Sequence, residues 1–300
     1  MNIGFIGIGR MGSPMARFLL QGGYQLSVCD PNPEMVKKAV SHGATAAGSV
    51  AQCARLSDVV FSSLPDDKIL GQTALGEAST GEAGIIASLK PGGIYVDTST
   101  VSPAISTEIA LAAGKRGVHY LRMPVSGNSN SAEAGELTAL VSGPPEAWKL
   151  VEPMVKKFST AQVYVGDAEQ ARYMKLVINL VVANTAGVLA EALALGRKGG
   201  LEWSTMLDGL AASTIGSPWV KAKARLLKTR DFTPTFTPNQ LSKDLDLMLD
   251  AGDALGVPLQ LTATTRQLMK ATNADGYAAE DFIAVVKVVE RLSGLPTDKA

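Results

Sequence analysis

The chain has few cysteines, no excess of charge of either sign and no uninterrupted apolar stretch long enough to cross a membrane. Its 300 residues include two cysteines, Cys29 and Cys53, which make neither a disulfide framework nor a metal site. The 28 basic residues balance the 28 acidic ones, so the charge indicates neither a nucleic-acid partner nor a charged tail. Polar residues such as Asn184 and Glu191 interrupt the longest apolar stretch, 176–195, so we expect no membrane span.

Length and apolar content are typical of a soluble protein with about two domains. Hydrophobic residues make up 46% of the chain and charged residues 19%. We expect no signal peptide, because the first predicted strand begins at residue 3. With its two cysteines expected to be free thiols, the protein is predicted to be cytoplasmic.

Strand and helix patterns alternate in the first half of the chain. The predicted strands are residues 3–8, 25–29, 44–46, 58–64, 94–97, 119–123, 137–142 and 163–164. The predicted helices are residues 13–21, 33–41, 50–55, 69–75 and 103–116. This alternation predicts a doubly wound parallel sheet of the Rossmann type, with helices on both faces.

Helical periodicity alone continues from about residue 166. The predicted helices are residues 170–198, 203–212, 217–227, 241–255, 259–271 and 282–292. The first of them would be roughly 43 Å long and could link two domains. We therefore predict an α/β chain with a dinucleotide-binding domain at 1–165 and an all-α substrate and dimerisation domain at 166–300.

The first twelve residues combine a short apolar strand with the pattern Gly7-x-Gly9-x-x-Gly12, and an apolar helix follows. In that context the pattern indicates a dinucleotide site. Gly7 would permit the tight turn, Gly9 the close approach of a pyrophosphate, and Gly12 the packing of helix on strand. The helix N-terminus would bind the phosphates. The predicted cofactor loop comprises Gly7, Ile8, Gly9, Arg10, Met11 and Gly12.

Asp30 ends the second predicted strand, 18 residues after Gly12. A carboxylate at about this distance accepts the ribose hydroxyls of NAD, whereas it would repel the 2′-phosphate of NADP. No arginine or lysine in Pro31-Asn32-Pro33 is available to hold that phosphate. We predict NAD as the cofactor; the alternative is that Asp30 only caps the next helix.

Three more segments are predicted to follow strands at the same sheet edge as the glycine loop. They are Ser62–Pro65, Asp97–Thr100 and Met123–Gly127. Ligands of open α/β sheets bind beyond the carboxyl ends of the strands. The hydroxyl and N–H groups here suit a small anionic substrate, although each segment alone also fits a structural role.

Lys175 and Asn179 lie four residues apart, on one face of an otherwise apolar helix. Burial would lower the pKa of a lysine toward the catalytic range. The alternative is a lysine that extends its ammonium group to solvent. Lys243, which Asp244 follows, is a second basic candidate, and its alternative is a surface ion pair.

These motifs together resemble the β-hydroxyacid dehydrogenase family over nearly the whole chain. The matching segments are Gly4–Met15, Pro124–Thr138, Lys175–Asn179 and Lys243–Leu245. Two of them match the family's patterns G-x-I-G-x-G-x-M-G-x-x-M and K-x-x-x-N, and the other two match its substrate-binding segment and its K-D-L. The four motifs occur in the family's order and spacing.

The resemblance implies a hydride transfer between NAD(H) and the hydroxyl-bearing carbon of a small 3-hydroxy acid, or the reverse reduction of a semialdehyde. Lys175 would be the general acid/base, beside a substrate held by Ser126, Gly127 and Asn179. The residues implied to line the cofactor outside the glycine loop are Asp30, Leu64, Pro65, Thr100 and Lys243. The apolar length of the helical domain further suggests a homodimer or homotetramer.

The chain departs from the family pattern next to the predicted pocket. Arg122 replaces an aspartate, Asn128 replaces a glycine, and Glu169 and Ala171 replace a G-x-G pair. Arg122 could add a cation to the pocket or lie at the surface, and Asn128 tolerates left-handed backbone angles. We predict that Arg122 and Asn128 take part in substrate binding, and that the substrate is larger or more polar than 3-hydroxyisobutyrate.

Two other hypotheses remain open from the sequence. One is an NADP-dependent imine or carbonyl reductase of the same fold, against which Asp30 and Lys175 argue. The other is a protein that binds NAD(H) without turnover, against which Lys175 and Asn179 argue. No metal site is predicted.

Overall fold

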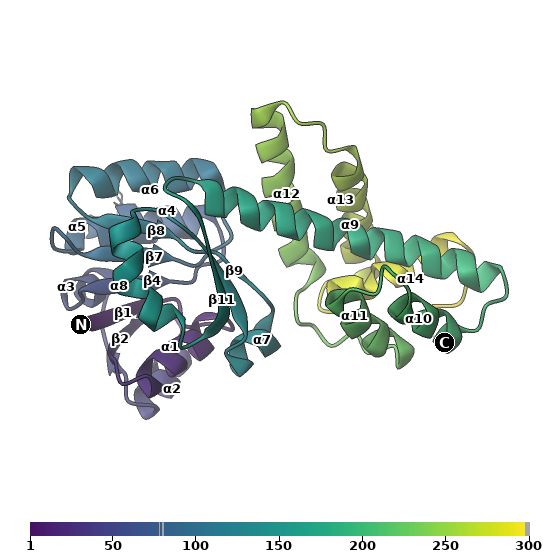
Figure 1. Ribbon diagram of the computed structural model, residues 1–300, viewed down its shortest axis with the longest axis horizontal. Coiled ribbons are helices and arrows are strands. Elements are labelled where there is room, and N and C mark those ends of the chain that lie inside the picture. The colour runs from purple at the N-terminus through teal and green to yellow at the C-terminus, as the bar shows by residue number, and fades with distance from the viewer. Residues whose placement is uncertain (78, 80, 298–300) are drawn as a thin grey trace. The chain divides into compact units, whose positions relative to one another are not determined.

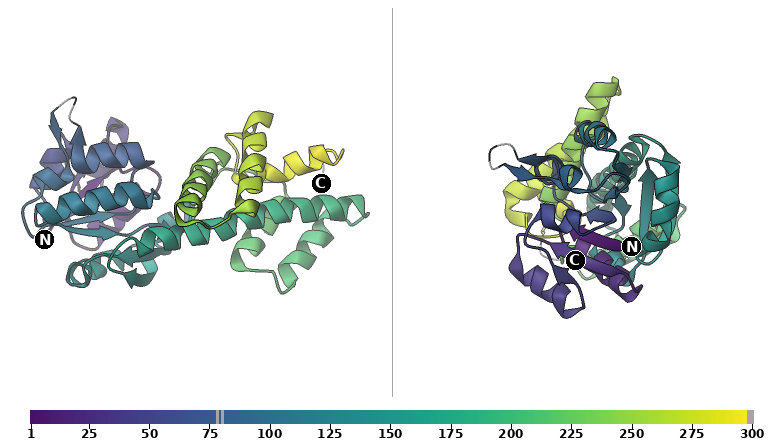
Figure 2. Two further views of the ribbon diagram at one scale, coloured as in Figure 1. Left: turned by 90° about the horizontal axis from the view of Figure 1, so that it is seen from above. Right: turned by 90° about the vertical axis from the view of Figure 1, so that its left-hand side faces the viewer.

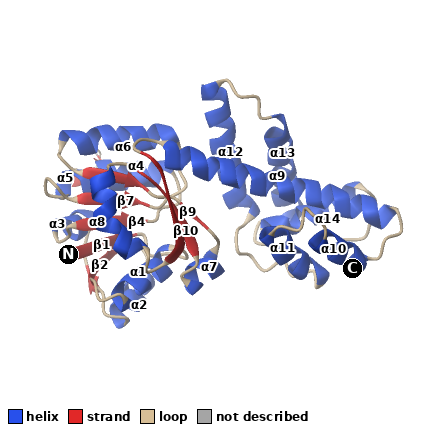
Figure 3. Cartoon of the chain, in the orientation of Figure 1, coloured by secondary structure: helices blue, strands red, loops and turns tan. Residues whose placement is uncertain are grey.

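A computed structural model gives the structure of the protein and describes residues 1–77, 79 and 81–297. The chain divides into two compact units, Met1–Leu176 and Val177–Ala300. All strands of the described residues belong to the first unit, and the second is helical (Figure 3). The predicted domain boundary at residues 165 and 166 precedes the long helix, whereas this division falls inside it.

The first unit is built on one large sheet with the order β11-β10-β8-β7-β4-β1-β2-β3. Its main strands are β1 Asn2–Ile6, β2 Gln25–Cys29, β3 Thr45–Ala46, β4 Val59–Ser62, β7 Ile94–Asp97, β8 His119–Arg122, β10 Leu137–Ser142 and β11 Ser159–Gly166. The six strands from β3 to β8 in this order run parallel, which confirms the prediction. The short β9, Val125–Ser126, and β8 run antiparallel to β10.

Helices cover both faces of this sheet (Figure 1). They are α1 Gly12–Gln21, α2 Pro33–Ser41, α3 Val50–Arg55, α4 Asp67–Leu75, α5 Ile85–Ser88, α6 Pro103–Lys115, α7 Ser129–Ala134 and α8 Pro145–Val155. Alternate residues of β7 show the two faces, because Ile94 and Val96 join one buried cluster and Tyr95 joins the other. Several short elements were not predicted from the sequence pattern. They are α5, α7, α8, β9 and the hairpin that β5, Gly76–Glu77, forms with β6, Glu82–Ala83.

A helix of 29 residues, α9 Gln170–Lys198, links the two units, with the predicted bounds (Figure 2). The other helices are α10 Trp203–Ala212, α11 Pro218–Lys228, α12 Pro238–Leu255, α13 Gln260–Thr272 and α14 Val285–Leu292, with short turns η1 Asn273–Tyr277 and η2 Phe282–Ala284. Side chains such as Trp203, Leu207 and Leu245 form the core of the second unit.

Among the described residues, α9 alone is long and apolar enough to cross a membrane by length and composition. In the structure, 39% of its most apolar window is buried inside the protein. Core helices of soluble proteins pass the same test. The polar side chains Asn179, Asn184 and Glu191 lie within this helix.

Candidate active site

In the turn between β1 and α1, two of the three glycine positions have no room for a side chain. Gly7 has a φ of +81°, and a Cβ there would lie 2.4 Å from the carbonyl oxygen of Ser63. A Cβ on Gly12 would lie 2.0 Å from the carbonyl oxygen of Gly7. The tight turn at Gly7 agrees with the prediction, and a Cβ on Gly12 would also lie 3.0 Å from Cε1 of Phe5 in β1, which agrees with the predicted close packing of helix on strand.

The third glycine faces open space, which fits a bound pyrophosphate. A Cβ on Gly9 would meet nothing within 4 Å. Helix α1 begins after Met11, whose side chain makes no capping hydrogen bond, and its first turn holds no acidic residue. The N–H groups of such a helix start attract an anion. The residues from Gly7 to Gly12 thus suit the diphosphate of a dinucleotide.

Asp30 fastens the glycine loop to the end of β2. Its Oδ2 accepts a hydrogen bond of 2.8 Å from Ile8 N, and its Oδ1 accepts one of 2.8 Å from Asn32 N. The cap of α2 is Asn32, whose side chain accepts a hydrogen bond from Glu34 N. The alternative that Asp30 merely caps α2 is therefore wrong. Each carboxylate oxygen keeps a lone pair that a ribose hydroxyl could use.

The segments after β4, β7 and β8 meet at the predicted sheet edge. Leu64 N donates to Ser99 Oγ at 2.9 Å, which joins the segment with Leu64 and Pro65 to the segment that ends at Thr100. Met123 N donates to the carbonyl oxygen of Asp97 at 2.8 Å, which joins the third segment to the second. The three segments are thus held together by hydrogen bonds.

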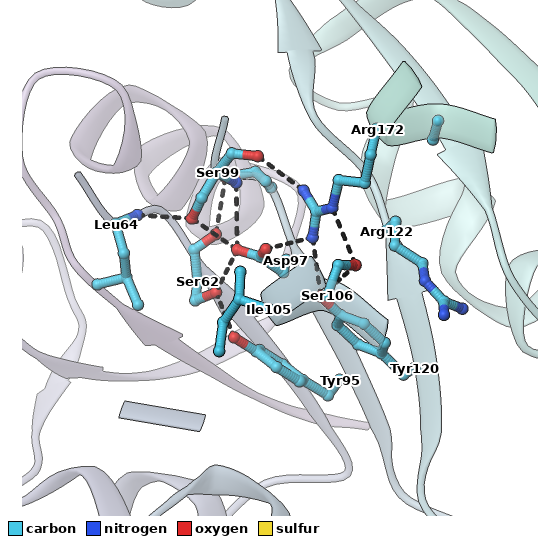
Figure 4. Close-up of polar contacts among 12 residues, drawn as sticks. Ser62, Leu64, Tyr95, Asp97, Ser99, Ile105, Ser106, Tyr120, Arg122 and Arg172 are labelled. Carbon is cyan, nitrogen blue, oxygen red and sulfur yellow. Dashed lines mark hydrogen bonds and ion pairs between the residues drawn. The ribbon is translucent and has the colours of Figure 1, made fainter. Parts of the chain in front are cut away.

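A buried group of polar side chains lies beneath these segments (Figure 4). Asp97 Oδ1 accepts from Ser62 Oγ at 2.9 Å and from Ser99 Oγ at 2.6 Å. Its Oδ2 pairs with Nη2 of Arg172, which belongs to the first turn of α9. Both partners of this ion pair are fully buried. Arg172 is not among the residues predicted for the site, although a cation in the first turn of an apolar helix is a recognisable signal.

The guanidinium of Arg172 uses four of its five donor positions inside the protein. It donates to the carbonyl oxygen of Ser99 at 2.7 Å, to Ser106 Oγ at 3.1 Å and to Tyr120 OH at 2.8 Å, besides Asp97. Burial disfavours the charged form, but Tyr120 and Asp97 outweigh it and raise the pKa of Arg172. Burial raises the pKa of Tyr120 to about 12, so this phenol is neutral near pH 7.

Lys175 follows Arg172 by three residues on α9, and 7% of it is exposed. The alternative of a lysine that reaches solvent is therefore wrong. Asn179, one helical turn further on, donates from Nδ2 to Asp244 Oδ2 at 2.7 Å. Lys243 Nζ lies 3.0 Å from Asp244 Oδ1, with 32% of the Lys243 side chain exposed. Lys243 thus forms the ion pair of the alternative interpretation, but the Asp244 partner is buried and does not lie at the surface.

The predicted carboxylate-binding segment forms a turn after β9. Ser126 pairs with Thr138 of β10, and Gly127 follows with a φ of +133° and a Cβ position 2.8 Å from Leu137 Cδ2. Asn128 has extended backbone angles, not left-handed ones, because it caps α7. Its Oδ1 accepts from the N–H groups of residues 130 and 131.

Arg122 is buried against Glu169. Its Nε donates to Glu169 Oε1 at 2.9 Å, its Nη2 bonds the same oxygen, and the guanidinium carbon lies 4.8 Å from the Tyr120 ring centroid. Only 6% of Arg122 is exposed, so the alternative of a surface arginine is wrong. The two departures from the family pattern, of opposite charge, compensate each other.

Two family models match consecutive parts of the chain. The NAD binding domain of 6-phosphogluconate dehydrogenase matches residues 2–166, and the NAD-binding domain of NADP-dependent 3-hydroxyisobutyrate dehydrogenase matches residues 170–289. The chain is 35% identical over 296 residues to 2-(hydroxymethyl)glutarate dehydrogenase of Eubacterium barkeri, covering 98% of this chain and 97% of that protein. The chain belongs to the β-hydroxyacid dehydrogenase family.

Other family members match at similar coverage. The 3-hydroxyisobutyrate dehydrogenase of Pseudomonas aeruginosa is 30% identical over 296 residues, covering 96% of this chain and 98% of that protein. A structure of Mycobacterium tuberculosis 3-hydroxyisobutyrate dehydrogenase with L-serine has a TM-score of 0.86 at 27% identity, covering 96% and 98% of the two chains.

These matches support the hypothesis of a hydroxyacid dehydrogenase over those of an imine or carbonyl reductase and of a non-catalytic NAD(H)-binding protein. The protein is an oxidoreductase of the β-hydroxyacid dehydrogenase family with a domain that binds NAD(P). Among the residues that the structure describes, no group of three or more histidine, cysteine or acidic side chains is placed to hold a metal ion.

Proposed function

We propose that the protein oxidises the hydroxyl-bearing carbon of a small 3-hydroxy acid with NAD, or reduces the corresponding semialdehyde with NADH. The observation that carries this proposal is Lys175, a buried lysine in the family's K-x-x-x-N pattern one turn before Asn179. A nicotinamide cofactor, when bound, supplies the hydride acceptor or donor. The protein then has to place the substrate and move one proton.

Lys175 is proposed to move that proton at the substrate's hydroxyl oxygen. As a neutral amine it would accept the proton during oxidation, and as an ammonium it would polarise the carbonyl during reduction. Asn179, with its amide held by Asp244, would orient the substrate. Ser126 and the N–H group of Gly127 would bind the carboxylate, in a turn that only glycine permits at residue 127.

We further propose that Arg122 and Asn128 contribute to substrate binding by shaping this turn. Arg122 is neutralised by Glu169 and Asn128 caps α7, so both support the backbone on either side of Ser126. The charge of Arg122 is therefore less available to a substrate than the sequence suggested. The proposal of a substrate larger or more polar than 3-hydroxyisobutyrate is supported by the name of the Eubacterium barkeri relative.

NAD is proposed in preference to NADP because of Asp30. Its carboxylate is held by Ile8 N and Asn32 N, which fixes a negative charge beside the glycine loop. A 2′-phosphate brought to this carboxylate would meet like charge. The remaining cofactor contacts are proposed for the glycine loop residues 7–12 and for Leu64, Pro65, Thr100 and Lys243.

An initial-rate panel tests the proposal. It combines NAD and NADP with 3-hydroxyisobutyrate, L-serine and 2-(hydroxymethyl)glutarate, and repeats the assay in the direction of reduction with the matching semialdehydes. We expect turnover with at least one acid and a kcat/KM for NAD at least about 10-fold above that for NADP. A preference for NADP would refute the role of Asp30, and full-rate selectivity for 3-hydroxyisobutyrate would refute the larger substrate.

We also propose a cytoplasmic homodimer or homotetramer. Helix α9 exposes apolar side chains at Val181, Val188 and Leu195, the last of them 76% exposed, and a second subunit would bury them. Cys29 and Cys53 are both free thiols, as a reducing compartment requires. Light scattering should give two or four times the mass of one chain, and Val188→Asp should lower it. A monomer at micromolar concentration would contradict this proposal.

A further inference from the structure

Hydrogen bonds to both backbone and side-chain groups attach the start of α9 to the sheet. Ser142 Oγ of β10 accepts from Ala171 N at 3.1 Å and donates to the carbonyl oxygen of Ala168 at 2.6 Å. Arg172 of the same turn bonds Asp97, the last residue of β7, and Tyr120 of β8. Residues of three strands thus fix both the backbone and a side chain of this turn.

The same group of side chains holds the segments that follow β4 and β7. We call Ser62, Asp97, Ser99, Ser106, Tyr120 and Arg172 the positioning network. Ser99 is its link to the cofactor side, because its hydroxyl bonds both Asp97 and Leu64 N while its carbonyl accepts from Arg172. A shift of Arg172 would therefore disturb the segments that carry Leu64 and Thr100 as well as the helix.

Lys175 lies three residues beyond Arg172, about 4.5 Å further along the helix axis and on nearly the same side. No flexible residue separates the two, because α9 is continuous from Gln170 to Lys198. Whatever fixes Arg172 therefore fixes the backbone position of Lys175. A displacement of about 1 Å at a reacting group can cost about 100-fold in rate.

We propose that Arg172 is a positioning residue for the reaction: through Asp97, Ser99, Ser106 and Tyr120 it sets the place of Lys175 relative to the cofactor-side segments. This inference rests on the proposed function of Lys175. Arginine suits the task because its planar fork directs donors to several acceptors at once, which a lysine ammonium cannot do in the same geometry.

The test replaces Arg172 by Gln and by Lys in the full-length enzyme and measures kcat, KM, NADH affinity and melting temperature. The assay uses the most active acid of the substrate panel, also deuterated at its hydroxyl-bearing carbon. We expect kcat to fall about 10- to 100-fold in Arg172→Gln, and the NADH Kd to rise by less than about 10-fold, because Leu64 and Thr100 are only part of the proposed cofactor contacts. The kcat of Arg172→Lys should lie between those of Arg172→Gln and the wild type. The deuterium isotope effect should rise in both variants as hydride transfer slows.

A matched control separates positioning from stability. Lys223→Gln breaks another buried ion pair, in which Lys223 Nζ lies 2.6 Å from Asp281 Oδ1. It should lower the melting temperature but leave kcat within about 2-fold. If Arg172→Gln does not fold, Arg172→Lys decides, because a folded enzyme with wild-type kcat and isotope effect would overturn the inference. Lys175→Ala separates the two proposals. A fully active Lys175→Ala enzyme would refute the proposed function. If Lys175→Ala is inactive while the Arg172 variants keep wild-type activity, only the inference about Arg172 is refuted.

Discussion

Replacement of Asp30 by alanine tests whether one carboxylate both builds the glycine loop and selects the cofactor. The side chain accepts two backbone hydrogen bonds of 2.8 Å, from Ile8 N and Asn32 N. Hydrogen bonds to charged groups contribute about 1.5–3 kcal/mol each, and solvent reaches both of these. We therefore expect Asp30→Ala to lower the free energy of unfolding by about 2–3 kcal/mol, measured by urea denaturation.

The same substitution should weaken NADH binding more than NADPH binding. The loss of charged acceptors for the ribose hydroxyls corresponds to about 10- to 100-fold in the NADH Kd. Removal of the negative charge should at the same time favour NADPH. Fluorescence titration of both cofactors gives the ratio of their Kd values, which we expect to shift toward NADPH.

Asn32→Ala is the matched control, because it removes the cap of α2 two residues away. It should cost about 1 kcal/mol of stability and leave the ratio of the two Kd values unchanged. Asp30 has no role in cofactor selection if Asp30→Ala binds NADH as tightly as the wild type, or if both variants change the ratio equally.

Two further substitutions test the packing that surrounds the site. Gly12→Ala places a Cβ 2.0 Å from the Gly7 carbonyl oxygen, so it should lower the stability and abolish NADH binding. Gly114→Ala in α6, with open space around it, should change neither quantity for the worse. Equal changes of stability and NADH binding in the two variants would contradict the packing argument. The raised pKa of Tyr120, about 12 against 10, contributes stability below pH 10 that is lost as pH rises to 12. This loss is about 3 kcal/mol, so urea unfolding of Tyr120→Phe should vary less with pH over that range, and an unchanged pH dependence would contradict it.

Most of the fold could be predicted because local patterns determined it. The bounds of β2, β7, β10, α2, α3 and α9 agree with the prediction residue for residue. Helix α8 was not predicted: Pro144, Pro145 and Pro153 obscure its periodicity. Pro145 in fact lies at the helix start, where its missing N–H costs nothing, and Pro153 lies in the last turn.

The glycine loop and the buried Lys175 could likewise be predicted, because each belongs to a short motif. The contacts of Arg172 and Arg122 could not, because their partners Asp97 and Glu169 lie 75 and 47 residues away in the chain. Only the folded sheet brings these charges together. The sequence shows that each charge is unusual in its place, but not which one neutralises it.

Lys175→Ala removes the proposed acid/base itself. We expect kcat/KM for the best 3-hydroxy acid to fall about 10²- to 10⁴-fold, because a positioned acid/base is lost. The NADH Kd should stay within about 2-fold, and Lys198→Ala, at the other end of α9, should keep wild-type activity. A Lys175→Ala enzyme that turns over within about 2-fold of the wild-type rate would show that Lys175 is not the acid/base.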